Sequence, residues 1–266
     1  MNSIKESEIL MEIAEILKDV SKEEGLYIDY AKICWSAMRL LQIIFDKGYQ
    51  LPVKVKEIYD RIHVRIQMVN LNEFMEGGDV RKINRIIGKI SIRPDYITSK
   101  TKITVYVDED ESPAMINYAL AHELCHLILN YKIQRYTDDY STMPMLPKES
   151  DELVADTFAV FLLIPFDKFL EVFKEYVQKS KDDGNIPIGT KDWLNYLSSV
   201  ASVPYHYVAC AYQQIRHVAF LMYQINKETS GIKRKKYEEK YGKVVMSLYE
   251  SIKDKMDKEV LAALFQ

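Results

Sequence analysis

The sequence contains little glycine and proline, and it has no long apolar run. Only 9 glycines and 8 prolines occur among 266 residues, which argues against a disordered chain and against a turn-rich all-β fold. No apolar run approaches the roughly 18 residues that a transmembrane helix needs. The N-terminal stretch MNSIKESEILMEIAEILKDV has charges between its apolar residues, so it predicts an amphipathic helix and not a signal peptide.

Cysteines are few, and the net charge is small. Cys34, Cys125 and Cys210 are odd in number and far apart, so we expect a reducing cytoplasmic location and no disulfide scaffold. A formal net charge of −3 does not favour nucleic-acid binding by the chain as a whole. The hydrophobic content of 48% is typical of a globular protein with a sizeable core.

The spacing of apolar residues predicts many helices and one small sheet. Alternation predicts strands at IHVRIQMV (62–69), IIGKISIR (86–93) and TKITVYV (101–107). Helical periodicity predicts helices at 4–20, 28–46, shortly after 52, 113–131, 150–163, 167–180, 191–200 and 204–222, with one or two more in 226–266. Gly48 is expected to end the second helix, and Ser112 to cap the helix at 113–131. The predicted fold class is α+β, mostly helical, with about three strands.

Two histidines, a glutamate and a cysteine interrupt the apolar helix YALAHELCHLIL (118–129). Burying polar groups without partners is costly, so these side chains require a partner. His122 and His126 are four residues apart and project from one helix face, where two imidazoles can bind one zinc ion. Glu123 lies about 100° around the helix and can serve as general base. This is the H-E-x-x-H arrangement of zinc peptidases, and it predicts one zinc per chain.

A second helix offers the third ligand that a catalytic zinc requires. In ESDELVADTFAVFLLIP (149–165), Glu152 and Asp156 are four residues apart on one face. We assign Glu152 to the metal, and Asp156 to the second ring nitrogen of a ligating histidine. If Glu152 is instead a solvated residue of the first helical turn, Glu149 and Asp151 are the fallback ligands.

The two histidines and the cysteines also have structural interpretations. The histidines could be core residues bonded to backbone carbonyls, but Glu123, Glu152 and Asp156 would then need separate explanations. We expect Cys125 to be a small buried apolar residue, although its offset from the first histidine would also permit a fourth ligand or a redox sensor. Cys34 and Cys210 lie in apolar helical stretches and are expected in the core.

The segments INYALAHELCHLILN and DELVADTFAVFLLIP resemble the ImmA/IrrE family of bacterial metallopeptidases. That family shows R-F-T-x-A-H-E-x-G-H, followed by E-x-x-A-N-x-F-A-x-x-L-L-x-P, and the resemblance covers roughly residues 50–220. It implies a zincin-like fold, with the sheet packed on the H-E-x-x-H helix. It also implies a gluzincin-type site, with His122, His126 and Glu152 on zinc. Glu123 would be the base.

Three positions depart from the family pattern. Cys125 replaces a glycine, Asn117 an arginine, and Asp156 an asparagine. An aspartate still accepts a histidine proton, so Asp156 is consistent with the assignment. Asn117 is expected to remove a positive charge near the site and so to alter the family's substrate contacts.

Three regions are expected along the chain: N-terminal helices at 1–50, a zincin-like catalytic domain at 51–180, and a C-terminal helical region at 181–266. The helix pair at 191–222 is similar to the helix-turn-helix-like region of the family. Its second helix, PYHYVACAYQQIRHVAF, has few cations and much apolar surface. We therefore expect a packed element or a protein-binding surface and no DNA binding.

The resemblance implies a zinc-dependent endopeptidase that cleaves a specific cytoplasmic protein, namely a helix-turn-helix repressor of a phage or mobile element. The alternative is a non-catalytic regulatory or toxin-like binding protein with a structural or vestigial zinc site. Glu123 favours the first, because a structural site has no use for a base. An aminopeptidase would need residues that bind a free amino terminus, and the sequence shows no motif for them.

Several roles remain open at the level of sequence. The oxyanion donor is sought among Tyr136, Tyr140, Tyr205 and His206. The strand at 101–107 is a candidate sheet edge that pairs with the substrate backbone. We expect the helices at 1–48 and 191–266 to bind the substrate or an activating protein, with Trp35 or Trp193 as anchors.

Overall fold

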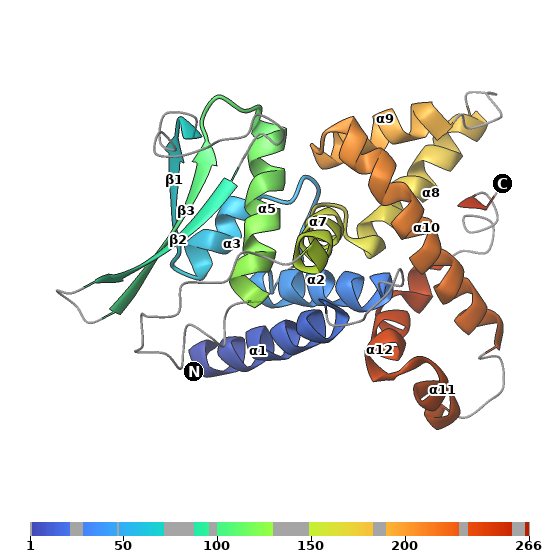
Figure 1. The fold of residues 1–266 in the computed structure, drawn as a ribbon. Coiled ribbons are helices and arrows are strands. Elements are labelled where there is room, and N and C mark those ends of the chain that lie inside the picture. Colours follow the sequence, from blue (N-terminus) through green and yellow to red (C-terminus); the bar gives the residue numbers. More distant parts are fainter. Residues whose placement is uncertain are drawn as a thin grey trace.

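A small mixed sheet lies at one side of a group of helices (Figure 1). The computed structural model describes residues 2–21, 29–46, 48–71, 88–95, 100–129, 149–182, 190–228, 234–256 and 264–265. The three strands are β1 (Arg65–Val69), β2 (Gly88–Asp95) and β3 (Lys100–Asp108), in the order β1-β3-β2. Strand β1 runs parallel to β3, and β2 runs antiparallel to it. The predicted fold class, mostly helical α+β with three strands, is confirmed.

Strand β3 is the central strand of this sheet. It pairs with β1 from Thr104 to Asp108, and with β2 from Lys100 to Val107. The prediction that residues 101–107 form a free edge is therefore wrong. Residues 104–108 are all buried. Because β3 has a paired strand on each side, it does not offer unpaired backbone groups to a substrate.

Helices make up most of the remaining described chain, and they match the predicted ones to within a few residues at most ends. They are α1 (Asn2–Ser21), α2 (Tyr30–Ile44), α3 (Val55–Arg61), α5 (Pro113–Leu129), α7 (Glu149–Leu163), α8 (Phe166–Asp182), α9 (Thr190–Ala201), α10 (Tyr205–Glu228), α11 (Arg234–Tyr241), α12 (Lys243–Ile252) and the short 3-10 helix η1 (Lys253–Lys255). Among the residues that the structure describes, no helix is both long and apolar enough to cross a membrane.

Of the two predicted helix ends, the cap at Ser112 is confirmed and the stop at Gly48 is not. The hydroxyl of Ser112 accepts a hydrogen bond from the backbone N–H of Met115 at 3.3 Å, so the predicted cap of α5 is confirmed. The prediction for Gly48 is wrong, because α2 ends at Ile44, where the N–H of Phe45 closes the last turn. Gly48 belongs to the following turn, where its φ of 88° suits glycine.

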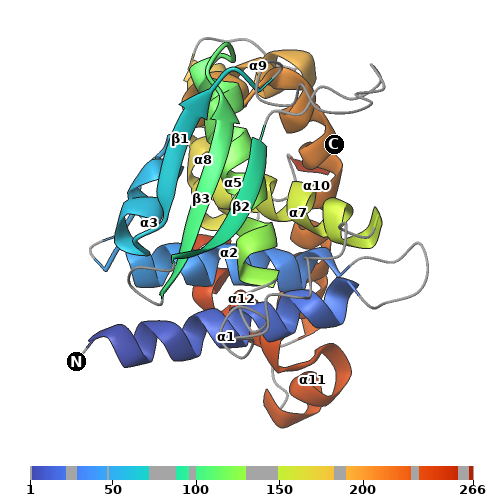
Figure 2. The same cartoon turned by 60° about the vertical axis from the view of Figure 1, so that its left-hand side comes forward.

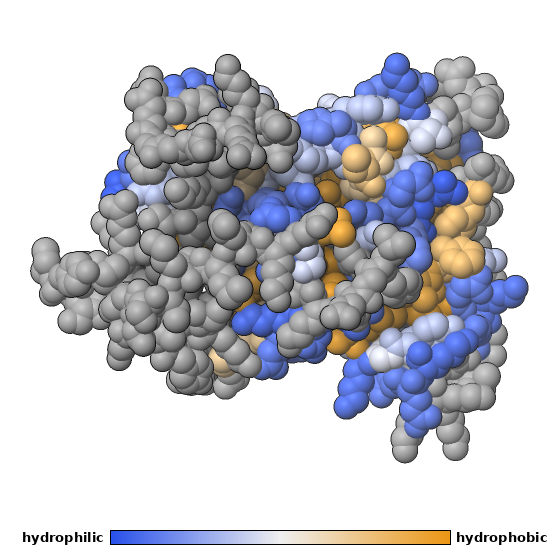
Figure 3. Space-filling model, viewed as in Figure 1, coloured by the Kyte–Doolittle hydropathy of each residue, from blue (hydrophilic) through white to orange (hydrophobic). Residues whose placement is uncertain are grey.

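Helix α5 lies between the sheet and α7, and it forms the centre of the structure (Figures 1 and 2). Its buried residues join a hydrophobic cluster that extends from Ile13 of α1 to Leu264 near the C-terminus. On the face shown in Figure 3, apolar residues reach the surface between α2, α10 and α12. The core thus draws on all three predicted regions, and the division at 51–180 stays a prediction.

An aromatic cluster holds α8 and α9 together. Trp193 is only 1% exposed, and it packs on the rings of Phe169, Phe173, Tyr176 and Tyr196. The prediction that Trp193 anchors a partner is therefore wrong, because its ring is already covered by the protein itself. Trp35 is half-buried and packs against the core.

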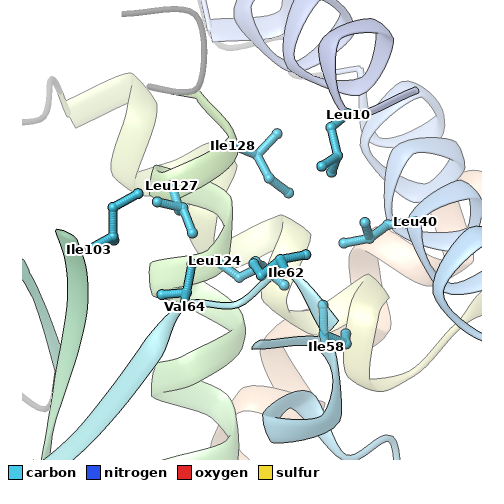
Figure 4. Close-up of a pocket in the computed structure, with 9 residues that line it drawn as sticks. All are labelled: Leu10, Leu40, Ile58, Ile62, Val64, Ile103, Leu124, Leu127 and Ile128. Atoms are coloured by element: carbon cyan, nitrogen blue, oxygen red, sulfur yellow. The ribbon is translucent and has the colours of Figure 1, made fainter. Parts of the chain in front are cut away.

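An apolar cavity of about 100 Å³ lies beside α5 (Figure 4). On α5 it is lined by Leu124, Leu127 and Ile128, which at about 100° per residue lie on the face opposite His122 and His126. The remaining lining is aliphatic as well: Leu10, Leu40, Ile58, Ile62, Val64 and Ile103. A space without polar partners does not hold ordered water, so this cavity belongs to the packing of the core.

Candidate metal centre

Helices α5 and α7 bring three potential metal ligands together. The Nε2 atoms of His122 and His126 lie 3.0 Å apart. The carboxylate of Glu152 lies 3.2 Å from Nε2 of His122 and 3.4 Å from Nε2 of His126. Ligands at zinc–ligand distances of about 2.0–2.1 Å are separated by about 3.3 Å in a tetrahedron. The three side chains thus have the chemistry and the spacing of a zinc site.

The local fold explains why these side chains converge. The two histidines are one turn apart on α5, and Glu152 lies in the first turn of α7, which packs along α5. Ala121 and Leu124 are at most 1% exposed and turn the other side of α5 into the core. Among the described side chains, the cluster contains Glu152 and not Asp151. The side chain of Glu149 lies outside the described residues.

Asp156 makes the contact that its spacing predicts. Its Oδ1 lies 2.8 Å from Nδ1 of His122 and also accepts the hydroxyl of Tyr118 at 3.0 Å. Burial would raise the pKa of Asp156, but the hydrogen bonds from His122 and Tyr118 hold it below the ordinary value. A carboxylate here keeps the proton of His122 on Nδ1, so that Nε2 presents its lone pair to a metal.

Glu123 lies half-buried beside the histidines. Burial raises the pKa of its carboxyl to about 7, with His122 opposing the rise and Glu152 adding to it. A group with a pKa near 7 can both accept and release a proton at neutral pH. The general-base role of Glu123 stays a prediction.

The comparison with known proteins identifies this part of the chain. Residues 82–209 match the family model of the IrrE N-terminal-like domain in the M78 peptidases. This segment is similar to the IrrE N-terminal-like domain. The matched segment contains both histidines, Glu123 and Glu152, and the resemblance to the ImmA/IrrE metallopeptidases is thereby confirmed. Searches of curated proteins and of solved structures found no match.

The family is one of metallopeptidases, so the match supports a metal-dependent hydrolase. The match begins after β1 and ends in the second turn of α10, which is a shorter span than the expected 50–220. Within it, the cluster of His122, His126 and Glu152 is compatible with a metal site.

The cysteines of the chain lie in two kinds of environment. Cys125 is fully buried in the core, as expected for a small apolar residue, and so is Cys34. The prediction that Cys210 belongs to the core is wrong, because its side chain is exposed. The buried residues of α10 include Val208 and Ala211, and Cys210 lies on another side of that helix.

The side chain of Asn117 has a structural role that the sequence does not predict. Its side chain donates to the carbonyl of Val53 at 2.8 Å and accepts from the N–H of Val55 at 3.1 Å. It therefore caps the start of α3, where Lys54 makes no side-chain cap. At about 100° per residue, Asn117 lies opposite the two histidines. The expected effect on charge at the metal site is therefore wrong for this side chain.

Two tyrosines near Asp156 make contacts that the sequence analysis does not predict. Tyr118 bonds Asp156, and its ring stacks on that of Tyr207 with centroids 3.7 Å apart. Tyr118 is one turn before His122, so its spacing could have indicated this contact. Tyr207 gives no local signal, because its position depends on how α10 packs.

The four proposed oxyanion donors are not brought to the ligands by any described contact. Tyr205 and His206 are exposed at the start of α10. Tyr136 and Tyr140 lie outside the described residues.

Proposed function

We propose that the protein is a zinc-dependent endopeptidase that hydrolyses a peptide bond in one specific cytoplasmic protein. The observation that carries this proposal is the cluster of His122, His126 and Glu152 with Glu123 beside it. His122, His126 and Glu152 would hold the zinc, which when bound supplies Lewis-acid chemistry for amide hydrolysis. The substrate class, a helix-turn-helix repressor of a phage or mobile element, rests on the family resemblance.

Glu123 performs the proton transfers in this mechanism. Its carboxylate accepts a proton from the attacking water and delivers it to the leaving nitrogen of the cleaved bond. Asp156 keeps His122 in one tautomer and one orientation throughout, since it bonds Nδ1 at 2.8 Å. Each of these steps is made by a residue of this chain.

The exposure of the cluster favours catalysis over a structural metal site. The side chain of Glu152 is 47% exposed, whereas those of His122 and His126 are 17% and 10% exposed, so the cluster opens to solvent at Glu152. Structural zinc sites are closed by four protein ligands, whereas catalytic sites keep a position open. Three ligand groups gather here among the described residues, and a polypeptide can approach them from solvent.

The test is cleavage of a defined substrate by the purified, zinc-loaded protein. Small helix-turn-helix repressors encoded beside the gene are incubated with the wild type and with Glu123→Gln. We expect the wild type to cut one repressor at one or a few bonds, Glu123→Gln to cut none, and casein to stay intact.

Each contrary result removes one part of the proposal. Cleavage by Glu123→Gln would remove Glu123 as the base. Digestion of casein would remove the specificity. A zinc-loaded wild type that binds a repressor without cutting it would favour the alternative, a regulatory binding protein.

A further inference from the structure

Helix α10 places an aromatic ring against the residues that hold His122. Tyr207, in the first turn of α10, lies flat on Tyr118 of α5, with ring centroids 3.7 Å apart and an angle of 19° between the rings. The hydroxyl of Tyr118 donates to Oδ1 of Asp156 at 3.0 Å. The same oxygen bonds Nδ1 of His122 at 2.8 Å. A continuous series of contacts thus runs from α10 to the candidate metal centre.

Asp156 needs this support because its side chain is 53% exposed. A carboxylate that is half in solvent can change rotamer, and each other rotamer would leave Nδ1 of His122 without its acceptor. The hydroxyl of Tyr118 is a second fixed partner that selects one rotamer. Tyr118 is only 4% exposed, and Tyr207 lies flat against its ring.

We propose that Tyr118 and Tyr207 are positioning residues of the metal centre. Tyr207 holds the ring of Tyr118, whose hydroxyl holds Asp156 on His122. The inference rests on the proposed function in so far as His122 is a metal ligand. It assigns the first turn of α10 a supporting role at the metal site.

The order of contacts sets the expected size of each effect. Removing a direct partner of a ligating histidine weakens metal binding by about 10- to 100-fold. Tyr118 acts one contact further out, so we expect Tyr118→Phe to weaken zinc binding by about 3- to 10-fold. Tyr207→Leu removes the stacked ring and should have a similar effect. Tyr207→Phe keeps the ring and should stay within about twofold of the wild type.

Competition with a chromophoric chelator measures the zinc affinity of each full-length variant, and thermal unfolding reports its folding. The double variant Tyr118→Phe/Tyr207→Leu should bind zinc no more weakly than the weaker single variant, because both residues act through Asp156. The matched control is Tyr223→Leu, which removes a tyrosine about 24 Å further along the same helix. It should leave the zinc affinity unchanged.

The outcomes separate this inference from the function on which it rests. An unchanged affinity in Tyr118→Phe overturns the positioning role, even if Tyr207→Leu does not fold. Equal losses in Tyr207→Phe and Tyr207→Leu overturn the role of the stacked ring. If the wild type itself binds no zinc, the proposed function fails, and the positioning role fails with it.

Discussion

The ammonium group of Lys255 lies 2.9 Å from the carboxylate of Asp167, although 88 residues separate them along the chain. Asp167 is buried in the first turn of α8, and its other oxygen accepts the hydroxyl of Tyr49 at 2.7 Å. The contact links η1, which follows the C-terminal helices, to the start of α8.

Replacing Lys255 by methionine should destabilise the protein. In this variant the buried carboxylate of Asp167 keeps its hydrogen bond with Tyr49 but loses the ammonium group. We expect this loss to lower the free energy of unfolding by about 1–3 kcal/mol. Chemical unfolding in urea measures the loss. The matched control is Lys253→Met, because Lys253 pairs with Glu250 on the surface and its loss should not be measurable. Equal unfolding midpoints for Lys255→Met and the wild type would contradict the prediction.

Lys255 should also make the unfolding free energy fall more strongly as the pH is lowered. Burial would raise the pKa of Glu171, but hydrogen bonds from Lys168 and Lys255 hold it below 4.5. A lowered folded-state pKa stabilises the protein above the unfolded-state value, and this contribution is lost as the pH falls through the folded-state pKa. Between about pH 5 and pH 3, the wild type should lose more unfolding free energy than Lys255→Met. Parallel curves in urea titrations over this range would count against the prediction.

Substitutions of the proposed ligands should lower the zinc content of the protein more than substitutions of the residues beside them. Alanine at His122, His126 or Glu152 should remove most of the zinc, whereas Glu123→Gln should retain it. Asp156→Ala should weaken binding by about 10- to 100-fold. Elemental analysis and chelator competition give the two readouts. Full zinc in Glu152→Ala would move the third ligand elsewhere, first to Glu149.

Asn117 should matter for stability and not for the metal. Asn117→Leu leaves the N–H of Val55 and the carbonyl of Val53 without their side-chain partner, which should cost about 1–3 kcal/mol. Asn117→Asp keeps the acceptor for Val55 but sets a second oxygen against the carbonyl of Val53, so it should also lose stability. Urea unfolding and zinc competition are measured on the same samples. A weakened zinc affinity with unchanged stability would contradict the assignment of Asn117 as a cap.

Two leucines, one on α5 and one on α7, should respond differently to truncation. Leu124 is 1% exposed and lines the apolar cavity, so Leu124→Ala should cost about 2–5 kcal/mol. Leu153 is 46% exposed, and Leu153→Ala should change the unfolding free energy by less than about 0.5 kcal/mol. Thermal and urea unfolding would show the contrast, and similar losses in both variants would contradict the burial of Leu124.

The three cysteines should differ in reactivity. Cys34 and Cys125 are buried, and burial raises the pKa of both thiols, so neither should react in the folded protein. Cys210 is exposed and should react with a thiol-specific dye. The expected count is one thiol per folded chain and three after denaturation. If more than one thiol reacts rapidly in the folded protein, the region around Cys34 or Cys125 opens to solvent readily.

The ligand cluster could be predicted because its information is local. His122 and His126 share a helix face by spacing alone, and so do Glu152 and Asp156, so only the meeting of two helices had to be assumed. The same periodicity predicts a contact of Asp156 with a ligating histidine, and the packing of α5 on α7 decides that this histidine is His122. The number of strands could likewise be predicted from alternation within each segment.

The incorrect predictions concern features that depend on tertiary packing. Residues 101–107 have no mark that distinguishes a central strand from an edge, since that depends on whether β1 and β2 both pair with them. The apolar neighbours of Cys210 predict a core position, whereas the direction of its side chain depends on which face of α10 packs. Tyr207 meets Tyr118 across 89 residues of chain, beyond the reach of any motif.

The candidate metal ligands come from two separate helices, so an ion bound there would couple folding to metal supply. An ion held by α5 and α7 acts as a non-covalent cross-link that the unfolded chain cannot reproduce. At a free zinc concentration 100 times the dissociation constant, such binding adds about 2.7 kcal/mol to the folded state. Zinc depletion would then shorten the lifetime of the protein in the cell, so that the same ion governs both how much protein persists and whether it can act.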